Sequence, residues 1–417
     1  MTNRTRVFAA RWIFPLASPP IHGGWVRVNR QQIVEVDQGR PPPGAEDLGD
    51  VALLPGLVNA HTHLEFSDCE LPIGEPGTPL YQWIGQVMAA RAATTSESKT
   101  HAIRQGLRES AAAGVSLIGE IATLPCDYPA AGECVAPSGR PVPSEGSESN
   151  ERRAGASACP ELVTFAETIG LSAPRGEERI EAAKRHLEQQ PRGAISPHAP
   201  YSTSRSLIER CVAMARQFDR PLAMHVAESP EERELLCNAS GPFAEALQQL
   251  GVWNQTLFPW QPQPMQWLIT QLAKAPRALL IHGNDLRTEE IAKLAEHPTL
   301  SVVYCPRTHA FFAHREHPVQ RLLQRGVRVA LGTDSRASNP DLNLWREVQF
   351  LLRHRQDLDP QAVLEMGTIA GADALGHRRH GRLQPGAPAQ LNRVMTTANT
   401  LAGVYRDLAE NRLSRVD

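Results

Sequence analysis

Two histidines separated by one residue, His61 and His63, follow directly on an apolar run at residues 53–60. Side chains alternate between the two sides of an extended segment, so both imidazoles are expected to project to the same side. Two neighbouring imidazole nitrogens can bind one metal cation, although such a triplet also arises by chance or as satisfied polar residues. The triplet therefore has to be weighed together with other candidate ligands.

Further polar side chains stand where other apolar runs end, namely His198, His225, His282 and Asp334. Because an unpaired polar group is costly to bury, convergence of these side chains on one metal explains them jointly. Three imidazoles and a carboxylate suit Zn²⁺, with Fe²⁺ or Mn²⁺ as alternatives. A metal held in this way lowers the pKa of bound water towards about 7, which predicts water as the nucleophile.

Glu228 lies three residues after His225 and is the predicted proton shuttle, since attack by water requires protons to leave the water and to reach the departing group. His282 and Asp334 are expected to position the hydroxide and to stabilise charge on the intermediate, with Asp334 also serving as a ligand. His198 is expected to face the substrate, and the alternative is a structural histidine at a strand end.

Three more glutamates follow Glu228 in a helix-like segment, and we interpret them as a solvated face near a helix start: Glu231, Glu232 and Glu234. The remaining histidines lie mostly in helical or loop contexts and are interpreted as residues without a role in the site. This interpretation is weakest for His309.

Apolar runs of strand length recur along the chain, and each is followed by a stretch with helical spacing, which is typical of repeated βα units. There are eight such runs, at residues 53–60, 114–120, 162–165, 193–196, 222–226, 278–282, 301–305 and 327–332. A doubly wound sheet usually carries a glycine-rich phosphate turn after its first strand, and none is present in the sequence. The pattern predicts an α/β fold of the (β/α)8 TIM-barrel type, with the candidate residues at the carboxyl ends of its strands.

The two ends of the chain have a different pattern, of short β-like pieces separated by turn residues. We expect residues 1–54 and 381–417 to form a small β-sandwich domain, with strands near 26–28 and 33–36 and a turn-rich β segment at 381–386, and residues 55–380 to form the barrel. Residues 126–160 are dense in Pro, Gly, Ser, Glu and Ala and are predicted to be a flexible insertion, either a lid or a tolerated loop.

The composition argues against several classes of protein. A formal net charge of -2 in 417 residues gives no field that would hold nucleic acid or an anionic membrane, so a small-molecule ligand is expected. The sequence contains no apolar run long enough to span a bilayer and no full-length signal peptide. The seven cysteines are scattered without a CxxC pair, which favours reduced thiols and a cytoplasmic location.

Several phrases carry a family resemblance: LLPGLVNAHTHLEFSD, ISPHAPYST, LAMHVAESPEE, LLIHGND and VALGTDSRASNPDLN. They resemble the amidohydrolase superfamily, in the branch that contains chlorohydrolases and the deaminases of S-adenosylhomocysteine, methylthioadenosine, guanine and aminodeoxyfutalosine. The resemblance implies one metal, held by His61, His63, His225 and Asp334. It also implies an acid/base role for Glu228, a catalytic role for His282 and a substrate contact for His198.

The resemblance also has departures. The adenosine-type branch places a glutamate for ribose hydroxyls in the helix after the first strand, whereas this chain has residues 83–86, Trp-Ile-Gly-Gln, in the comparable stretch. Segments 305–312 and 332–335 look closer to aminodeoxyfutalosine deaminases. Glu65 and Trp83 are kept as further candidate substrate contacts.

Three hypotheses about function follow. The first is a deaminase that replaces an exocyclic amine on a purine-like or other N-heterocyclic ring by oxygen and releases ammonia. The second is a dechlorinase or another amidohydrolase acting on a heteroaromatic or cyclic amide substrate. The third is a non-catalytic barrel scaffold, which the presence of every proposed ligand argues against. A homodimer is a candidate assembly.

Overall fold

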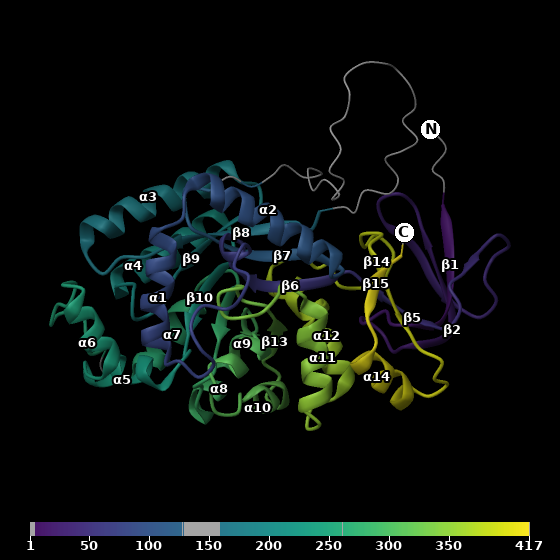
Figure 1. The fold of residues 1–417 in the computed structure, drawn as a ribbon. Helices are drawn as coiled ribbons and strands as arrows, with labels where there is room; N and C mark the ends of the chain where they lie inside the picture. The colour runs from purple at the N-terminus through teal and green to yellow at the C-terminus, as the bar shows by residue number, and fades with distance from the viewer. Residues whose placement is uncertain (1–4, 127, 129–158, 261, 417) are drawn as a thin grey trace, which may run out of the picture.

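The structure is a computed structural model that describes residues 5–126, 128, 159–260 and 262–416. Its strands form an eight-stranded sheet and a seven-stranded sheet, and Figure 1 shows the two side by side. Of the predicted insertion at 126–160, only residues 126, 128, 159 and 160 are described, so both interpretations of it lie outside the described residues.

The eight-stranded sheet is parallel, and each of its strands pairs with the strands of the sheet that precede and follow it in the chain. An isolated parallel bridge between Thr62 and Asp334 links the two edge strands, so the sheet is a nearly closed barrel. This confirms the predicted (β/α)8 fold. The barrel strands are β6 (Leu57–Thr62), β7 (Val115–Ala122), β8 (Glu161–Thr168), β9 (Gly193–Pro197), β10 (Leu222–Val226), β11 (Ala278–His282), β12 (Leu300–Tyr304) and β13 (Arg328–Leu331).

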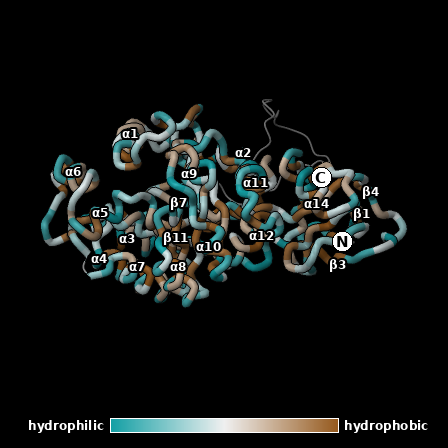
Figure 2. Tube along the Cα trace, turned by 90° about the horizontal axis from the view of Figure 1, so that it is seen from below, coloured by the Kyte–Doolittle hydropathy of each residue, from teal (hydrophilic) through white to brown (hydrophobic). Residues whose placement is uncertain are grey.

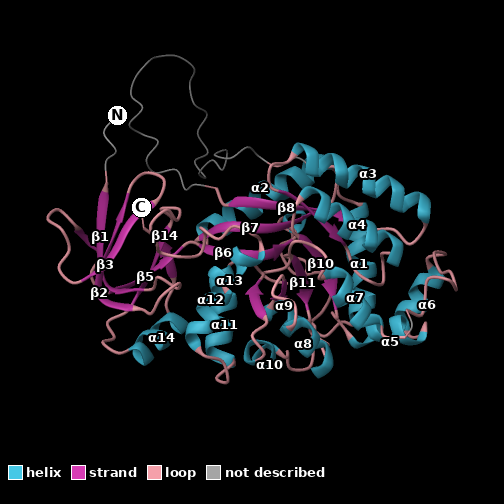
Figure 3. Cartoon of the chain, turned by 180° about the vertical axis from the view of Figure 1, so that it is seen from behind, coloured by secondary structure: helices cyan, strands magenta, loops and turns pink. Residues whose placement is uncertain are grey.

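Helices surround the barrel (Figure 3). Several begin at side chains that accept a hydrogen bond from a free backbone N–H, such as Ser204, Asn343 and Asp359. The helices are the 3-10 helix η1 (Leu64–Phe66), α1 (Leu80–Ala92), α2 (Ser96–Ala112), α3 (Ala173–Gln189), α4 (Arg205–Phe218), α5 (Pro230–Asn238), α6 (Pro242–Gln249), α7 (Pro264–Leu272), α8 (Thr288–Ala295), α9 (Pro306–Phe311), α10 (Val319–Gln324), α11 (Leu344–His354), α12 (Pro360–Met366), α13 (Ile369–Ala374) and α14 (Leu401–Glu410).

The barrel strands are buried on both faces, which explains why they appear as continuous apolar runs in the sequence. One set of their side chains, including Val58, Leu117 and Phe165, packs in one cluster. The neighbouring set, including Leu57 and Ile118, packs in a second cluster together with residues of the helices. A barrel packed in this way leaves its strand ends as the place for a functional site.

The seven-stranded sheet combines both ends of the chain. Its strands are β1 (Arg6–Ile13), β2 (Ile21–Val28), β3 (Ile33–Gln38), β4 (Glu46–Asp47), β5 (Val51–Pro55), β14 (Leu391–Met395) and β15 (Leu413–Arg415). The order is β15-β14-β5-β1-β2-β3, with β4 against β1. The small domain expected from the two termini is thus present as one mixed sheet. Helix α14 contacts both β14 of this sheet and α11 of the barrel, and Figure 2 shows α11 and α14 next to each other on the side of the barrel that faces the small sheet.

Two local expectations were wrong. The run at residues 53–60 is two strands, because Gly56 separates β5 from β6. A Cβ on Gly56 would lie 2.5 Å from the Ser116 Cβ, so the chain passes this point only as glycine. The segment 381–386 forms turns, and the carboxyl-terminal strand begins later, at Leu391.

The state of the described cysteines can be compared with the expected reduced thiols. Cys69, Cys126, Cys211, Cys237 and Cys305 are free, whereas Cys159 is disulfide-bonded, so the expectation of reduced thiols is wrong at that position. Among the described residues, no helix has the length and apolar character needed to cross a bilayer.

Candidate metal centre

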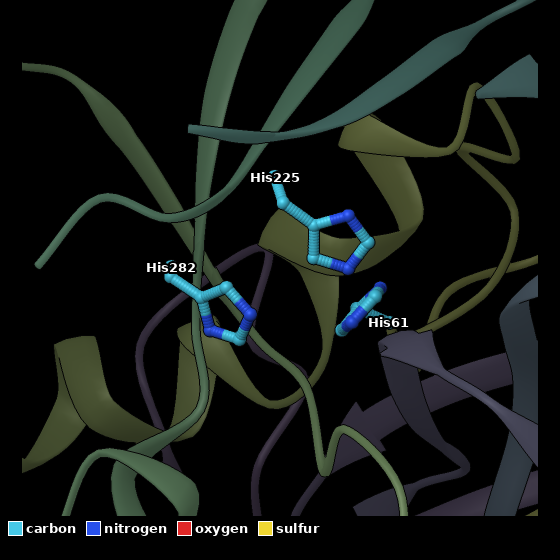
Figure 4. Close-up of side chains that lie close together, drawn as sticks. All are labelled: His61, His225 and His282. Carbon is cyan, nitrogen blue, oxygen red and sulfur yellow. The ribbon is translucent and has the colours of Figure 1, made fainter. Parts of the chain in front are cut away.

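Five predicted side chains converge at the carboxyl ends of the barrel strands. His61 lies in β6 and His63 follows it directly. The others are His225 in β10, His282 at the end of β11, and Asp334 after β13. Nε2 of His63 lies 3.3 Å from Nε2 of His225, and Nε2 of His61 lies 3.5 Å from Oδ1 of Asp334. Figure 4 shows the rings of His61, His225 and His282 gathered at one point.

The hydrogen bonding of these imidazoles fits a divalent ion. Both ring nitrogens of His61 and Nδ1 of His63 are buried and lack a hydrogen-bond partner among the described residues. His225 pairs its Nδ1 with the carbonyl oxygen of His198 at 2.8 Å, which leaves Nε2 with a free lone pair facing the centre. Burial lowers the pKa of His63 and His225 well below the ordinary range, so both rings are neutral, the form that binds metal.

The carboxylate of Asp334 is fixed by its surroundings. Ser338 donates to Oδ2 at 2.8 Å, and the Asp334 backbone N–H donates to the carbonyl oxygen of His61 at 3.2 Å. The residue also has a left-handed backbone with φ of 55°, a conformation that His282 and Ala227 share at 71° and 53°. Such strained positions persist only where the surrounding structure determines them, and they are frequent at functional sites.

Glu228 lies beside this cluster and is 6% exposed. Its Oε1 is 3.3 Å from Nε2 of His282, and Tyr201 donates to its Oε2 at 3.1 Å. Burial, followed by the charges of Asp334 and Glu232, raises the pKa of Glu228 well above its ordinary value. Burial lowers the pKa of His282 well below its ordinary value. Both shifts favour the uncharged form of each group, and a protonated Glu228 can give up a proton.

Glu232 corrects one interpretation of the sequence. It is fully buried rather than part of a solvated face. Its Oε1 accepts from the backbone N–H of Ala227 at 2.9 Å and its Oε2 accepts from that of Glu228 at 3.0 Å. The available signal was the Ser-x-x-Glu pattern at Ser229, because a glutamate in the third helical position commonly accepts N–H groups at the helix start. Glu232 thus fixes the backbone that carries Glu228.

Replacing Glu232 by glutamine is expected to lower kcat by about 10- to 100-fold, since a small displacement of a reacting group has effects of this size. The glutamine side chain keeps one acceptor oxygen for the first backbone N–H. Its NH₂ group then faces the second backbone N–H, which loses its acceptor. Steady-state kinetics measures the effect, and Glu231→Gln, on the more exposed neighbour, is the control. An unchanged kcat in Glu232→Gln would contradict this role.

The other predicted contacts have separate surroundings. His198 follows β9, pairs its Nδ1 with Ser202 Oγ at 2.7 Å, and its ring centre is 4.9 Å from that of His225. Glu65 is buried in η1 and forms an ion pair with Arg91. Trp83 donates to the carbonyl oxygen of residue 73 at 2.9 Å and packs edge-on against residue 312. The structure thus places His198 at the cluster, whereas the contacts of Trp83 are with loop residues.

A comparison with protein-family models matches residues 52–410 to the amidohydrolase family. The chain belongs to the amidohydrolase family. As an amidohydrolase it is a hydrolase acting on carbon–nitrogen bonds, and its cofactor is a divalent metal ion.

Two curated relatives of this amidohydrolase are named deaminases. A 5-methylthioadenosine/S-adenosylhomocysteine deaminase of Nitratidesulfovibrio vulgaris (strain Miyazaki F) is 29% identical over 381 residues, which cover 89% of this chain and 77% of the relative. An aminodeoxyfutalosine deaminase of Deinococcus radiodurans is 26% identical over 359 residues, which cover 81% and 76%. The family identified from the sequence is thereby confirmed.

A solved structure shares the fold of this amidohydrolase. The aminofutalosine deaminase of Helicobacter pylori in complex with methylthio-coformycin aligns with a TM-score of 0.78 and 19% identity, covering 99% of this chain and 100% of that chain. At this identity the likeness establishes the architecture of barrel and small sheet.

The amidohydrolase also has acidic residues beside the site that the sequence prediction missed. Glu120 accepts the backbone N–H of Leu64 with both oxygens, at 3.1 and 3.0 Å, and so fixes the chain directly after His63. Arg91 forms ion pairs with Glu65 and with Glu167, whose Oε2 is 3.5 Å from Arg91 Nη1. A signal for Glu120 and Glu167 was present, because both are carboxylates near the ends of otherwise apolar strands.

His317, interpreted as a bystander, supports the backbone of His282. Its Nε2 donates to the His282 carbonyl oxygen at 2.9 Å, and its ring stacks on Tyr304 at 3.8 Å between centres. Burial lowers the pKa of His317 to about 3. The neutral ring is therefore the form that the fold requires.

A pH dependence of stability follows for His317. Between its ordinary pKa of 6.5 and the folded value of about 3, the unfolded chain binds a proton that the folded chain does not. Its contribution to the free energy of unfolding is therefore lost as the pH falls, at up to about 1.4 kcal/mol per pH unit. We expect the stability gap between the wild type and His317→Gln to narrow from pH 7 to pH 5 in denaturant titrations. His101→Gln, at an exposed position, should keep the wild-type slope, and a constant gap for His317→Gln would contradict the assignment.

Proposed function

We propose that this amidohydrolase is a deaminase that hydrolyses an exocyclic amine of a purine-like or related N-heterocyclic ring and releases ammonia. The observation that carries the proposal is the position of the buried carboxyl group of Glu228, held between Tyr201 and His282 at the edge of the metal-ligand cluster. An amine leaves a tetrahedral carbon only after it has gained a proton, and a carboxyl group with a raised pKa supplies one.

The residues proposed to hold the ion are His61, His63, His225 and Asp334. Three neutral imidazoles and a carboxylate favour Zn²⁺, and Fe²⁺ or Mn²⁺ suits the same donors. When bound, a divalent ion acidifies water and makes hydroxide available near neutral pH.

Glu228 is proposed to move the protons. Water contributes the oxygen that bonds to the ring carbon, and the bond from that carbon to the exocyclic nitrogen breaks. Glu228 gives a proton to the ring nitrogen as the oxygen adds, takes one from the water, and passes it to the departing amine, which leaves as ammonia. The remaining proton of the added hydroxyl returns to Glu228 as the carbonyl forms. One water is consumed, and the product carries a carbonyl where the amine was.

The neighbouring side chains are proposed to orient the reactants. Asp334 accepts a hydrogen bond from the attacking water, while His282, held between Glu228 and the carbonyl contact of His317, stabilises charge on the added oxygen. His198 is proposed to contact the ring. Glu65 and Trp83 remain proposed substrate contacts. Glu65 is also ion-paired with Arg91.

The substrate class is proposed from the relatives and from one departure. The curated relatives are named deaminases of methylthioadenosine, S-adenosylhomocysteine and aminodeoxyfutalosine, which are adenine-containing compounds. Segments 305–312 and 332–335 look closer to aminodeoxyfutalosine deaminases, so we place an aminodeoxyfutalosine-like compound ahead of methylthioadenosine. Hydrolytic dechlorination of a heteroaromatic ring is the second candidate, since it uses the same activated water.

A substrate panel tests the proposal. Metal-replete protein is assayed for ammonia with aminated purines and their nucleosides, pyrimidines, pterins and triazines, and for chloride with chlorinated triazines. Ammonia release from a purine compound supports the deaminase. Chloride release without ammonia favours the dechlorinase, and absence of both on metal-loaded protein would contradict the proposal.

A further inference from the structure

A second group of metal-type donors lies at the opposite end of the barrel. Glu161 is the first residue of β8, whereas the site described above lies at the carboxyl ends of the strands. His377 and His380 follow α13, in the segment that leads from the barrel to β14 of the small sheet. One potential ligand atom from each of these three residues lies within 4.8 Å of the other two.

The orientation of His380 is that of a metal ligand. Its Nε2 lies 3.4 Å from Oε2 of Glu161, close to the 3.3 and 3.5 Å that separate donor atoms in the metal centre. Its Nδ1 lies 3.5 Å from Oγ of Ser116, which donates to the carbonyl oxygen of Leu57. Metal-bound histidines commonly use the second ring nitrogen in such an outer contact, which fixes the ring.

A basic side chain also contacts Glu161. Arg192 lies 2.6 Å from Oε2 of Glu161, but a carboxylate has four lone pairs and can bind a cation as well.

We propose that Glu161, His377 and His380 bind a second divalent cation of the zinc type, which ties the start of β8 to the chain segment that enters the small sheet. Two imidazoles and one carboxylate are a donor set that Zn²⁺ takes with water in the fourth position. The ion would have a structural role, because it joins segments far apart in the sequence and lies at the end of the barrel away from Glu228. This site is independent of the proposed deamination.

Metal stoichiometry tests the proposal. Protein is incubated with excess ZnCl₂, passed through a desalting column and analysed for zinc per chain by mass spectrometry. We expect about two equivalents for the wild type and about one for His377→Ala and for Glu161→Gln. Both residues are only partly buried, so both variants should fold. The control is His101→Ala, which removes an exposed imidazole from α2 and should keep two equivalents.

Two further measurements separate this site from the metal centre. Hydrolase activity of His377→Ala should stay within about twofold of the wild type at saturating zinc, because the metal centre is unchanged. Zinc should raise the melting temperature of the wild type in a second, weaker step that both variants lack. A single equivalent in the wild type, or two equivalents retained in both variants, would overturn the proposal.

Discussion

Glu228→Gln is expected to lose kcat by about 10³-fold or more while the protein keeps its metal and its fold, because the amide cannot transfer a proton. Glutamine has nearly the shape of glutamate, so Tyr201 and Asn284 can keep their contacts with residue 228. The loss should appear in kcat more than in KM, which is the pattern of an interaction made in the transition state. Ammonia release under substrate saturation measures it.

The control for Glu228→Gln is Glu234→Gln, which removes a carboxylate from the same helix region and should leave kcat unchanged. Zinc content and the melting temperature of each variant show whether the centre and the fold are intact. If Glu228→Gln keeps full kcat with full zinc content, Glu228 is not the acid/base and the proposed proton path is wrong.

Asp334→Asn is expected to cause the second large loss, through the metal. The substitution keeps the size of the side chain but removes the only carboxylate among the proposed ligands. Loss of one ligand should weaken binding by about 10²-fold or more and lower activity in parallel, by analogy with the 10- to 100-fold cost of removing outer partners of a metal site. Zinc per chain after dialysis against a weak chelator, measured beside kcat, checks both effects.

Asp357→Asn is the matched control for Asp334→Asn, since Asp357 is an exposed residue paired with Arg355. It should keep both zinc and activity. Full zinc occupancy in Asp334→Asn after the same dialysis would remove Asp334 from the ligand set, even if activity fell.

The barrel was predictable from the sequence because a strand buried on both faces must be apolar along its length, whatever its partners are. The small domain was predictable only in outline. Apolar residues continue from Leu53 to Val58 on both sides of Gly56, so the sequence gives no polar break where β5 ends and β6 begins. The Pro55-Gly56 pair was the available signal for a break, whereas the close approach of Ser116, which requires glycine here, comes from a distant part of the chain.

The imidazoles of the site were predictable because strand periodicity and strand ends are local properties. The side chains that hold them in place were harder to predict. Glu120 acts on Leu64, and His317 acts on His282, through contacts that only the folded barrel brings about. The left-handed conformation of Ala227 carries no sequence signal either, since alanine rarely adopts it.

The place of β5 in the small sheet has a consequence for how the protein is made. β5 pairs with β14 over the register from Val51 with Met395 to Pro55 with Leu391. During translation, therefore, one edge of β5 stays uncovered until nearly the whole chain has left the ribosome, on the order of tens of seconds. An uncovered edge invites pairing with other nascent chains, so premature termination before Leu391 should yield products that aggregate.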